Sequence, residues 1–305
     1  MTLLILGDSH GGALRWGLSR LDRTTRRKLR ARFGPLRAGM LETGLYFLNR
    51  FHRIEDGGLY FRGNRAATAL LEIGGRALPI RASDDTVFGF CFGLHIAHLM
   101  RDLTWKNFTL DPTDTTKFFV SDSAYRDMCL SIQSNTLNFF RDAKAMGLRF
   151  FVLAAPPIRE DFTTIYPDIG APADVLAKVN RFREIMVEEF GSLNIPVVFP
   201  PSDVASGGFL RPWLAATRKD DAHHANYRYG ILVWRHIAAN MDGLCAQLPP
   251  PPPVVGFRAH SRRLSHSLVD LAVNRWWPAG KRVQRFGRRA LYGGKKRSAG
   301  SRPNY

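Results

Sequence analysis

A serine near the start of this chain and an aspartate and a histidine more than 200 residues downstream could together carry out acyl transfer. Ser9 occurs in the run Gly7-Asp8-Ser9-His10 near the start, and an Asp-x-x-His pattern follows far downstream, just before the last long helical segment. On one helical turn that spacing lets the carboxylate reach the imidazole Nδ1–H and fix its tautomer, which leaves Nε2 to take a proton from a serine. Such a set performs nucleophilic catalysis on an ester.

The Asp-x-x-His spacing occurs twice, in overlapping registers. Asp220 stands three residues before His223, and Asp221 stands three residues before His224. Both pairs satisfy the geometric requirement, so the spacing alone leaves the choice between them open.

The surroundings of Ser9 predict a strand, a sharp turn and a helix. Residues 2–6 form a short apolar run bounded by glycine, which is typical of a buried strand. Leu14, Leu18 and Leu21 then recur at helical spacing. Ser9 is therefore expected at the carboxyl edge of a sheet and at a helix N-terminus, where developing negative charge is stabilised. For Gly-Asp-Ser alone, the alternative is an ordinary loop with a capping serine.

Taken together, the two blocks resemble the SGNH hydrolases, the GDSL-type esterases. That family carries its nucleophilic serine in Gly-Asp-Ser directly after the first strand, and its last block is Asp-x-x-His, often continued as His-x-Asn with a nearby glycine. The resemblance selects Asp221 and His224, because only this register puts Asn226 and Gly230 in the family's positions. It implies Ser9 as nucleophile, His224 as base and Asp221 as the group that orients the base. The side chains expected to face substrate are Asp8, His10, His223 and Asn226.

The resemblance also implies an oxyanion hole. The Ser9 N–H is one expected donor, and a glycine N–H after the second strand is another, with Gly39 as the candidate and Gly44 as the second choice. Family members complete the hole with an asparagine, but here Gly93-Leu94-His95 stands at that place, so His95 would replace it. An imidazole N–H can donate to an oxyanion, and losing one donor typically costs about 100- to 1000-fold in rate. The alternative for His95 is a buried histidine with its hydrogen bonds satisfied.

Strands and helices are expected to alternate along the first 248 residues. Further strands are expected within residues 33–41, 86–92, 148–155 and 195–199, and helices at 124–146, 173–190 and 226–241. This order predicts the α/β class: a three-layer α/β/α sandwich with a mostly parallel sheet, as in SGNH and flavodoxin-like folds. Residues 45–80 are expected to be an irregular insertion with a small hairpin. The five prolines 249–253 predict a stiff polyproline linker.

The positive charge of the 305-residue chain is concentrated in residues 254–305. The whole chain carries a formal charge of +18, and this tail holds thirteen Lys or Arg and one acid. A basic tail with apolar residues at helical spacing predicts binding to an anionic membrane surface or a soluble, partly disordered extension; nucleic-acid binding is not favoured. No signal peptide or membrane span is evident, so a cytoplasmic protein is expected, and the membrane alternative for the tail would make it peripheral to the inner membrane surface.

The three cysteines have no close spacing and are odd in number, which argues against a disulfide framework and a thiolate metal site. No metal and no cofactor are expected. The expected activity is hydrolysis of acyl or acetyl esters of a carbohydrate or lipid. Two alternatives are a catalytically weakened protein that binds a glycan or a protein partner through the same cleft, and a sugar O-acyltransferase. The sequence leaves the oligomeric state open.

Overall fold

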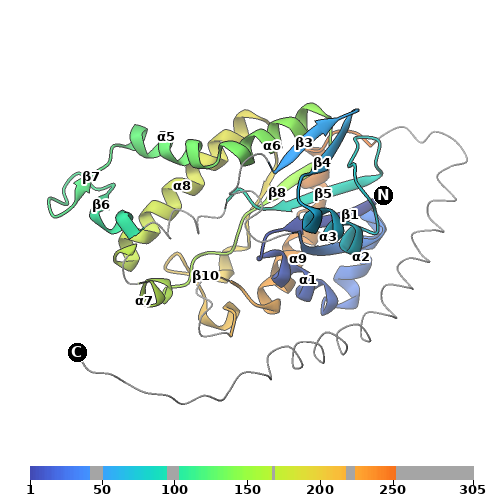
Figure 1. The fold of residues 1–305 in the computed structure, drawn as a ribbon. Coiled ribbons are helices and arrows are strands. Elements are labelled where there is room, and N and C mark those ends of the chain that lie inside the picture. Colours follow the sequence, from blue (N-terminus) through green and yellow to red (C-terminus); the bar gives the residue numbers. More distant parts are fainter. Residues whose placement is uncertain (42–50, 95–102, 167–168, 218–223, 252–305) are drawn as a thin grey trace, which may run out of the picture. The chain divides into compact units, whose positions relative to one another are not determined.

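The computed structural model describes residues 1–41, 51–94, 103–166, 169–217 and 224–251, all within one compact unit, Met1–Pro252. A five-stranded sheet runs through it (Figure 1). Its strands, in chain order, are β1 (Thr2–Gly7), β2 (Leu36–Met40), β5 (Thr86–Cys91), β8 (Phe150–Leu153) and β9 (Val197–Val198). In space their order is β2-β1-β5-β8-β9, and every neighbouring pair is parallel. The predicted parallel α/β architecture is confirmed.

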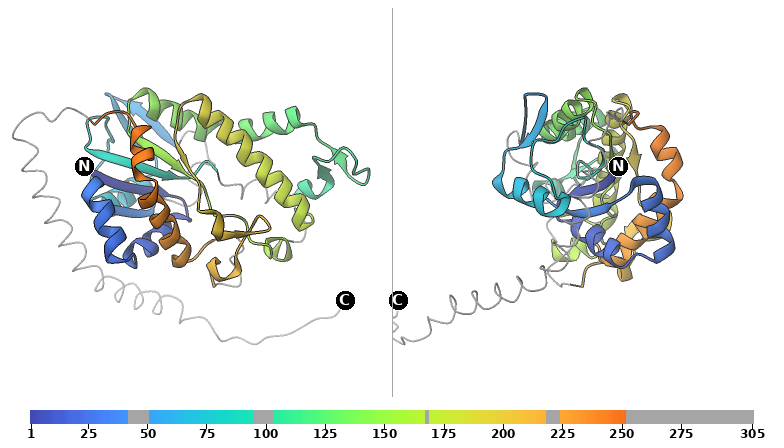
Figure 2. Two further views of the ribbon diagram at one scale, coloured as in Figure 1. Left: turned by 180° about the vertical axis from the view of Figure 1, so that it is seen from behind. Right: turned by 90° about the vertical axis from the view of Figure 1, so that its right-hand side faces the viewer.

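Helices cover both faces of the sheet (Figures 1 and 2). One face carries α1 (Gly11–Ser19), α2 (Arg23–Phe33), α9 (Tyr227–Ala239) and α10 (Met241–Ala246). The other carries α3 (Asn64–Gly74), α6 (Ser134–Ala145) and α8 (Pro172–Ser192), and α5 (Asp122–Ile132) and α7 (Phe162–Ile165) pack against α8. The three-layer sandwich is therefore present as expected.

The alternation of side chains along β1 divides the interior into two cores. Leu3 and Ile5 pack into the core beneath α1, α2 and α9, whereas Leu4 and Leu6 pack into the core on the opposite face. All four are almost fully buried. The second core is rich in phenylalanine: the rings of Phe90 and Phe140, for example, lie 6.0 Å apart edge to face.

Smaller elements connect these layers. The insertion forms an antiparallel hairpin of β3 (His52–Glu55) and β4 (Gly58–Phe61), as expected, and then α3, which the sequence analysis did not predict. The remaining short elements are β6 (Phe108–Thr109), β7 (Phe118–Phe119), β10 (Ala205–Ser206), β11 (Phe209–Leu210) and 3-10 turns at Leu103–Asn107, Ser202–Val204 and Pro212–Leu214.

The single helix predicted over residues 124–146 is wrong. The chain leaves helical geometry at Gln133, where φ is −90° and ψ is 5°, and α5 and α6 are separate helices. The bend has a packing reason: the Tyr125 hydroxyl of α5 donates to the Lys178 carbonyl on α8, whereas Phe140 of α6 packs against the sheet. One straight helix would not serve both contacts.

The strand order identifies where a ligand site is expected. The chain passes from β1 outward to β2 and then returns to β5 on the other side of β1, so the order reverses between β1 and β5. In open parallel sheets, ligands bind outside the carboxyl ends of the strands at this switch point. The residue run that follows β1 is the one that contains Ser9. Within the described ranges, no helix is both long and apolar enough to cross a membrane.

Candidate active site

Ser9 lies in the tight turn that joins β1 to α1. The turn is held at both ends, because the Asp8 N–H donates to the Cys91 carbonyl at 3.4 Å and the Gly11 N–H donates to the Asp8 carbonyl at 3.0 Å. The Ser9 side chain is half-buried. Among the described residues, the Ser9 N–H donates to no acceptor, so it is available to an oxyanion beside the Ser9 hydroxyl.

The carboxylate of Asp8 belongs to this turn. Its Oδ1 accepts the His10 N–H at 2.8 Å, and both Asp8 and His10 are only 3% exposed. Burial raises the pKa of Asp8 to about 7, against the opposing effect of the His10 hydrogen bond. Asp8 was expected to face substrate, but in this structure it points inward and caps the turn.

The base expected from sequence, His224, is brought to the residue next to Ser9. The imidazole rings of His10 and His224 lie 5.0 Å apart, centroid to centroid. The His224 carbonyl accepts the Ala216 N–H at 2.9 Å, and Ala225 forms a β-bridge with Ala215. These contacts fix the backbone of His224 just before α9 begins.

Two glycines allow α9 to approach α1 closely. A Cβ on Gly230 would overlap the Ala13 carbonyl, and a Cβ on Gly17 would overlap the Gly230 backbone. The buried Trp234 indole N–H donates to the Leu14 carbonyl at 2.9 Å and ties the same two helices together. Because Ser9 precedes α1 and His224 precedes α9, this packing sets the distance between the two candidate catalytic residues.

Asn226 has a defined structural role. Its Oδ1 accepts the Arg228 N–H at 2.8 Å, which caps α9, and its Nδ2 donates to the Trp213 and Ala215 carbonyls at 2.8 and 2.9 Å. Both amide hydrogens are thereby used. The side chain expected to face substrate instead fastens the segment that carries His224 to the start of α9.

Gly39 lies inside β2, opposite Leu6. Leu41 donates its N–H to the Gly7 carbonyl at 2.8 Å, and alternate residues of a parallel strand face the same neighbour, so the Gly39 N–H also points toward β1. A Cβ on Gly11 would lie 2.5 Å from the Gly39 oxygen, so the first residue of α1 is in close contact with the backbone of β2. The geometry makes Gly39 a packing residue rather than an oxyanion donor.

Several predicted site residues lie outside the described residues. They are Gly44, His95, Asp220, Asp221 and His223. Gly93, two residues before His95, has φ of +92°, in the left-handed region that favours glycine. The orienting acid and the side-chain oxyanion donor therefore remain predictions.

The surroundings of Asp8 include two buried side chains, Cys91 and Tyr229, that the sequence did not indicate as part of the site. Burial and the nearby Asp8 charge raise the pKa of the Cys91 thiol, and burial, with Cys91 adding to it, raises that of Tyr229. Burial lowers the pKa of Arg183, the nearby Tyr229 opposes this shift, and the Arg183 Nη2 donates to the Pro156 carbonyl at 2.8 Å. The sequence does contain a signal for Arg183, because this arginine stands beside the apolar helical positions Val179, Phe182 and Met186, which are buried.

Comparisons with known proteins give likenesses of fold. No protein-family model matches the sequence, and no curated protein matches it. One similar structure is a candidate SGNH hydrolase from Slackia heliotrinireducens, 14% identical over 79% of this chain and 98% of that one, with a TM-score of 0.42. A carbohydrate acetylesterase family member from Sinorhizobium meliloti is 13% identical over 80% and 99%, with a TM-score of 0.41. An acetyl xylan esterase is 12% identical over 78% and 98%, with a TM-score of 0.39. None of these likenesses carries a residue role over to this chain, so the candidate roles of Ser9 and His224 rest on the geometry above.

Proposed function

We propose that this chain is an SGNH-type serine esterase that hydrolyses short acyl esters, acetyl esters above all. The observation that carries the proposal is the meeting of two distant segments: the turn that holds Ser9 and the segment that holds His224, whose ring lies 5.0 Å from that of His10. A hydroxyl and an imidazole at the switch point of a parallel sheet, beside an unused backbone N–H, suit acyl transfer.

The mechanism follows from these groups. Ser9 Oγ attacks the ester carbonyl carbon while His224 accepts the hydroxyl proton, and Asp221 orients the imidazole and stabilises its charged form. The Ser9 N–H, with the positive end of the α1 dipole behind it, stabilises the oxyanion. His224 then protonates the leaving alcohol. Water attacks the acyl-serine in the same way and releases the acid, which returns Ser9 to its starting form.

The alcohol part of the ester is proposed to be a carbohydrate. Trp213 is 50% exposed and belongs to the segment that Asn226 ties to the start of α9, close in sequence to the Ala215–Ala225 bridge beside His224. An exposed indole offers a flat apolar surface on which a ring-shaped alcohol can pack. A lipid ester is the second choice for the same chemistry.

The test compares Ser9→Ala with the wild type on p-nitrophenyl acetate and on an acetylated xylooligosaccharide. We expect kcat to fall at least about 1000-fold, because the nucleophile is removed while the fold is kept. Ser19→Ala, which alters an exposed serine at the end of α1, is the matched control and should keep full activity. A serine-directed phosphonate should label the wild type and not Ser9→Ala. Equal hydrolysis or equal labelling by the two proteins would refute the assignment.

A further inference from the structure

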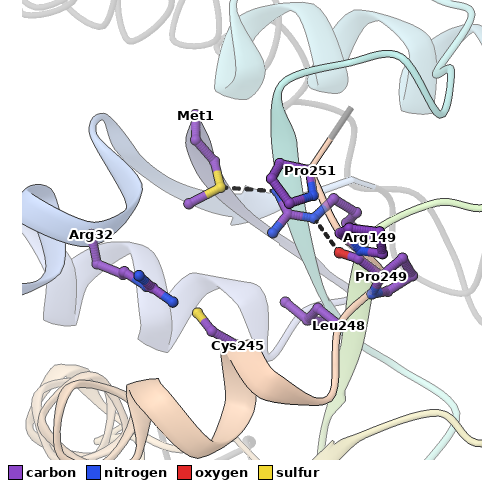
Figure 3. A pocket seen from close by; sticks show the side chains of 8 residues that line it. Met1, Arg32, Arg149, Cys245, Leu248, Pro249 and Pro251 are labelled. Atoms are coloured by element: carbon purple, nitrogen blue, oxygen red, sulfur yellow. Dashed lines mark hydrogen bonds between the residues drawn. The ribbon is translucent and has the colours of Figure 1, made fainter. Parts of the chain in front are cut away.

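A pocket lies at the opposite end of the sheet from Ser9. It is lined by Met1, Arg32, Arg149, Cys245, Leu248 and the prolines 249–251, and has a volume of about 190 Å³ (Figure 3). Met1 immediately precedes β1 and Arg149 immediately precedes β8, so the pocket is at the amino edge of the sheet. β1 alone separates the two ends by about 20 Å at its usual rise per residue. The pocket is therefore distinct from the candidate active site.

Arg149 is held in the pocket by neutral partners. It is 7% exposed, its Nε donates to the Pro249 carbonyl at 2.9 Å, and its Nη1 contacts Met1 Sδ at 3.0 Å (Figure 3). Burial lowers its pKa, which means that its charge is incompletely compensated. Within the described part of the chain, no carboxylate forms an ion pair with Arg149, and Asp85, the acid that acts on it through space, is paired with the N-terminal ammonium. Among the residues that the structure describes, its remaining N–H groups have no anionic partner.

Arg32 approaches the same space from the last turn of α2. Its guanidinium points toward Cys245 on α10 (Figure 3). Asp242 attracts Arg32 only through space, and among the described residues Arg32 forms no ion pair. Two guanidinium groups thus border one pocket whose lining contains no acidic side chain.

We propose that this pocket binds a small organic anion, with a carboxylate or phosphate group held by Arg32 and Arg149. Guanidinium groups bind such oxyanions through paired, charge-assisted hydrogen bonds. Met1, Leu248 and the prolines supply apolar walls for the rest of the ligand. A cavity of about 150 Å³ is enough for benzene, so the ligand is of the size of one ring with its anionic group.

Cys245 provides a reporter inside the pocket of the full-length protein. Cys91 and Cys129 are buried, whereas Cys245 is partly exposed. The experiment measures thiol–disulfide exchange with a dianionic aryl disulfide, 5,5′-dithiobis(2-nitrobenzoate), and with the neutral 4,4′-dithiodipyridine. The ratio of the two rates cancels the intrinsic reactivity of the thiol and isolates the attraction of the pocket for an anion. Cys245→Ser should abolish the native-state reaction and so confirms the site of labelling.

Arg32→Gln should lower the rate ratio of anionic to neutral reagent about fivefold to tenfold, since a charged rim concentrates an oppositely charged reagent. The matched control is Arg27→Gln, which removes an exposed charge from the same helix outside the pocket and should leave the ratio within about twofold. If Arg32→Gln and Arg27→Gln have the same ratio, the pocket does not select anions and the proposal is wrong.

Protection by ligands tests the size and charge of the occupant. Benzoate and phenylphosphate should slow the labelling of Cys245 and raise the melting temperature, whereas the neutral benzyl alcohol should do neither. Inorganic phosphate should protect less than phenylphosphate, because it lacks the apolar body. Arg32→Gln should remove both effects. Protection by benzyl alcohol equal to that by benzoate, or none by any anion, would overturn the proposal. All these readouts are independent of Ser9, so their failure would leave the proposed esterase untouched.

Discussion

The two ends of β1 accommodate charge in different ways. At the carboxyl end, a short turn presents a backbone N–H and the N-terminus of α1, and the carboxylate of Asp8 is buried within the turn. At the amino end, two long guanidinium side chains border a pocket whose lining contains no acid. The first arrangement depends on where backbones lie, and the second depends on which side chains the chain supplies.

This difference determines which substitutions should matter at each end. Close backbone approaches at glycines hold the carboxyl-end site together, so a single added methyl group there is damaging. The amino-end pocket should tolerate changes of shape in its flexible side chains but should lose its proposed anion binding when a charge is removed.

Asp221→Asn should abolish most of the esterase activity at the carboxyl end. A misoriented base with the wrong tautomer typically costs about 10,000-fold in kcat. Asp220→Asn should retain activity within about threefold, because the preferred register gives that residue no part in catalysis. Measuring kcat for both variants on p-nitrophenyl acetate distinguishes the registers. A large loss in Asp220→Asn alone would instead assign the base to His223.

Gly230→Ala should destabilise the protein by about 3 to 5 kcal/mol, because the added Cβ overlaps the Ala13 carbonyl and forces α1 and α9 apart. Gly243→Ala is the matched control: nothing lies within 4 Å of a Cβ at that position, and the helical α10 should gain up to about 1 kcal/mol. Denaturant unfolding of both variants measures the difference. Equal stabilities would mean that the glycine contact does not hold the two helices together.

The elements that position the site could be predicted because their signals are local. The apolar run before Ser9 and the helical spacing after it lie within about two dozen residues, and β1 and α1 form there. The bend at Gln133 could not be predicted in this way, because it arises from the separate demands of Tyr125 and Phe140 on elements distant in sequence.

The same reasoning explains which site residues were misjudged. Asn226 was assigned by its place in a motif, but the carbonyls that occupy its amide come from Trp213 and Ala215, eleven or more residues away. The amino-end pocket joins Met1, Arg32 and Arg149 with residues near Pro249, and no spacing in the sequence brings these together. This pocket can be recognised only from the packing of the folded chain.

Asp8→Asn should stabilise the protein increasingly as the pH rises. The folded pKa of about 7 lies above the ordinary value of 3.8, so between these values the folded protein binds more protons than the unfolded chain and loses stability as the pH increases. The accumulated loss is on the order of 4 kcal/mol above pH 7. Asparagine keeps the acceptor for the His10 N–H and removes the buried charge.

Unfolding free energies at pH 5 and pH 8 measure this effect. The gain from Asp8→Asn should be larger at pH 8. Asp22→Asn is the control, because the hydrogen bonds of Thr25 lower the Asp22 pKa to about 2 and any effect of that substitution should be constant across this range. A gain from Asp8→Asn that is equal at both pH values would show that Asp8 is not destabilised by burial.

The smallest expected effect tests whether the two ends act independently. Arg32→Gln removes a charge about a strand's length from Ser9, beyond the distance of about 10 Å over which salt screens exposed charges, so kcat/KM on p-nitrophenyl acetate should stay within about twofold of the wild type. Ser9→Ala should likewise leave the labelling ratio of Cys245 unchanged. A change of more than about fivefold in either direction would mean that the sheet couples the two sites energetically, since binding at one end would then alter the other by the same factor.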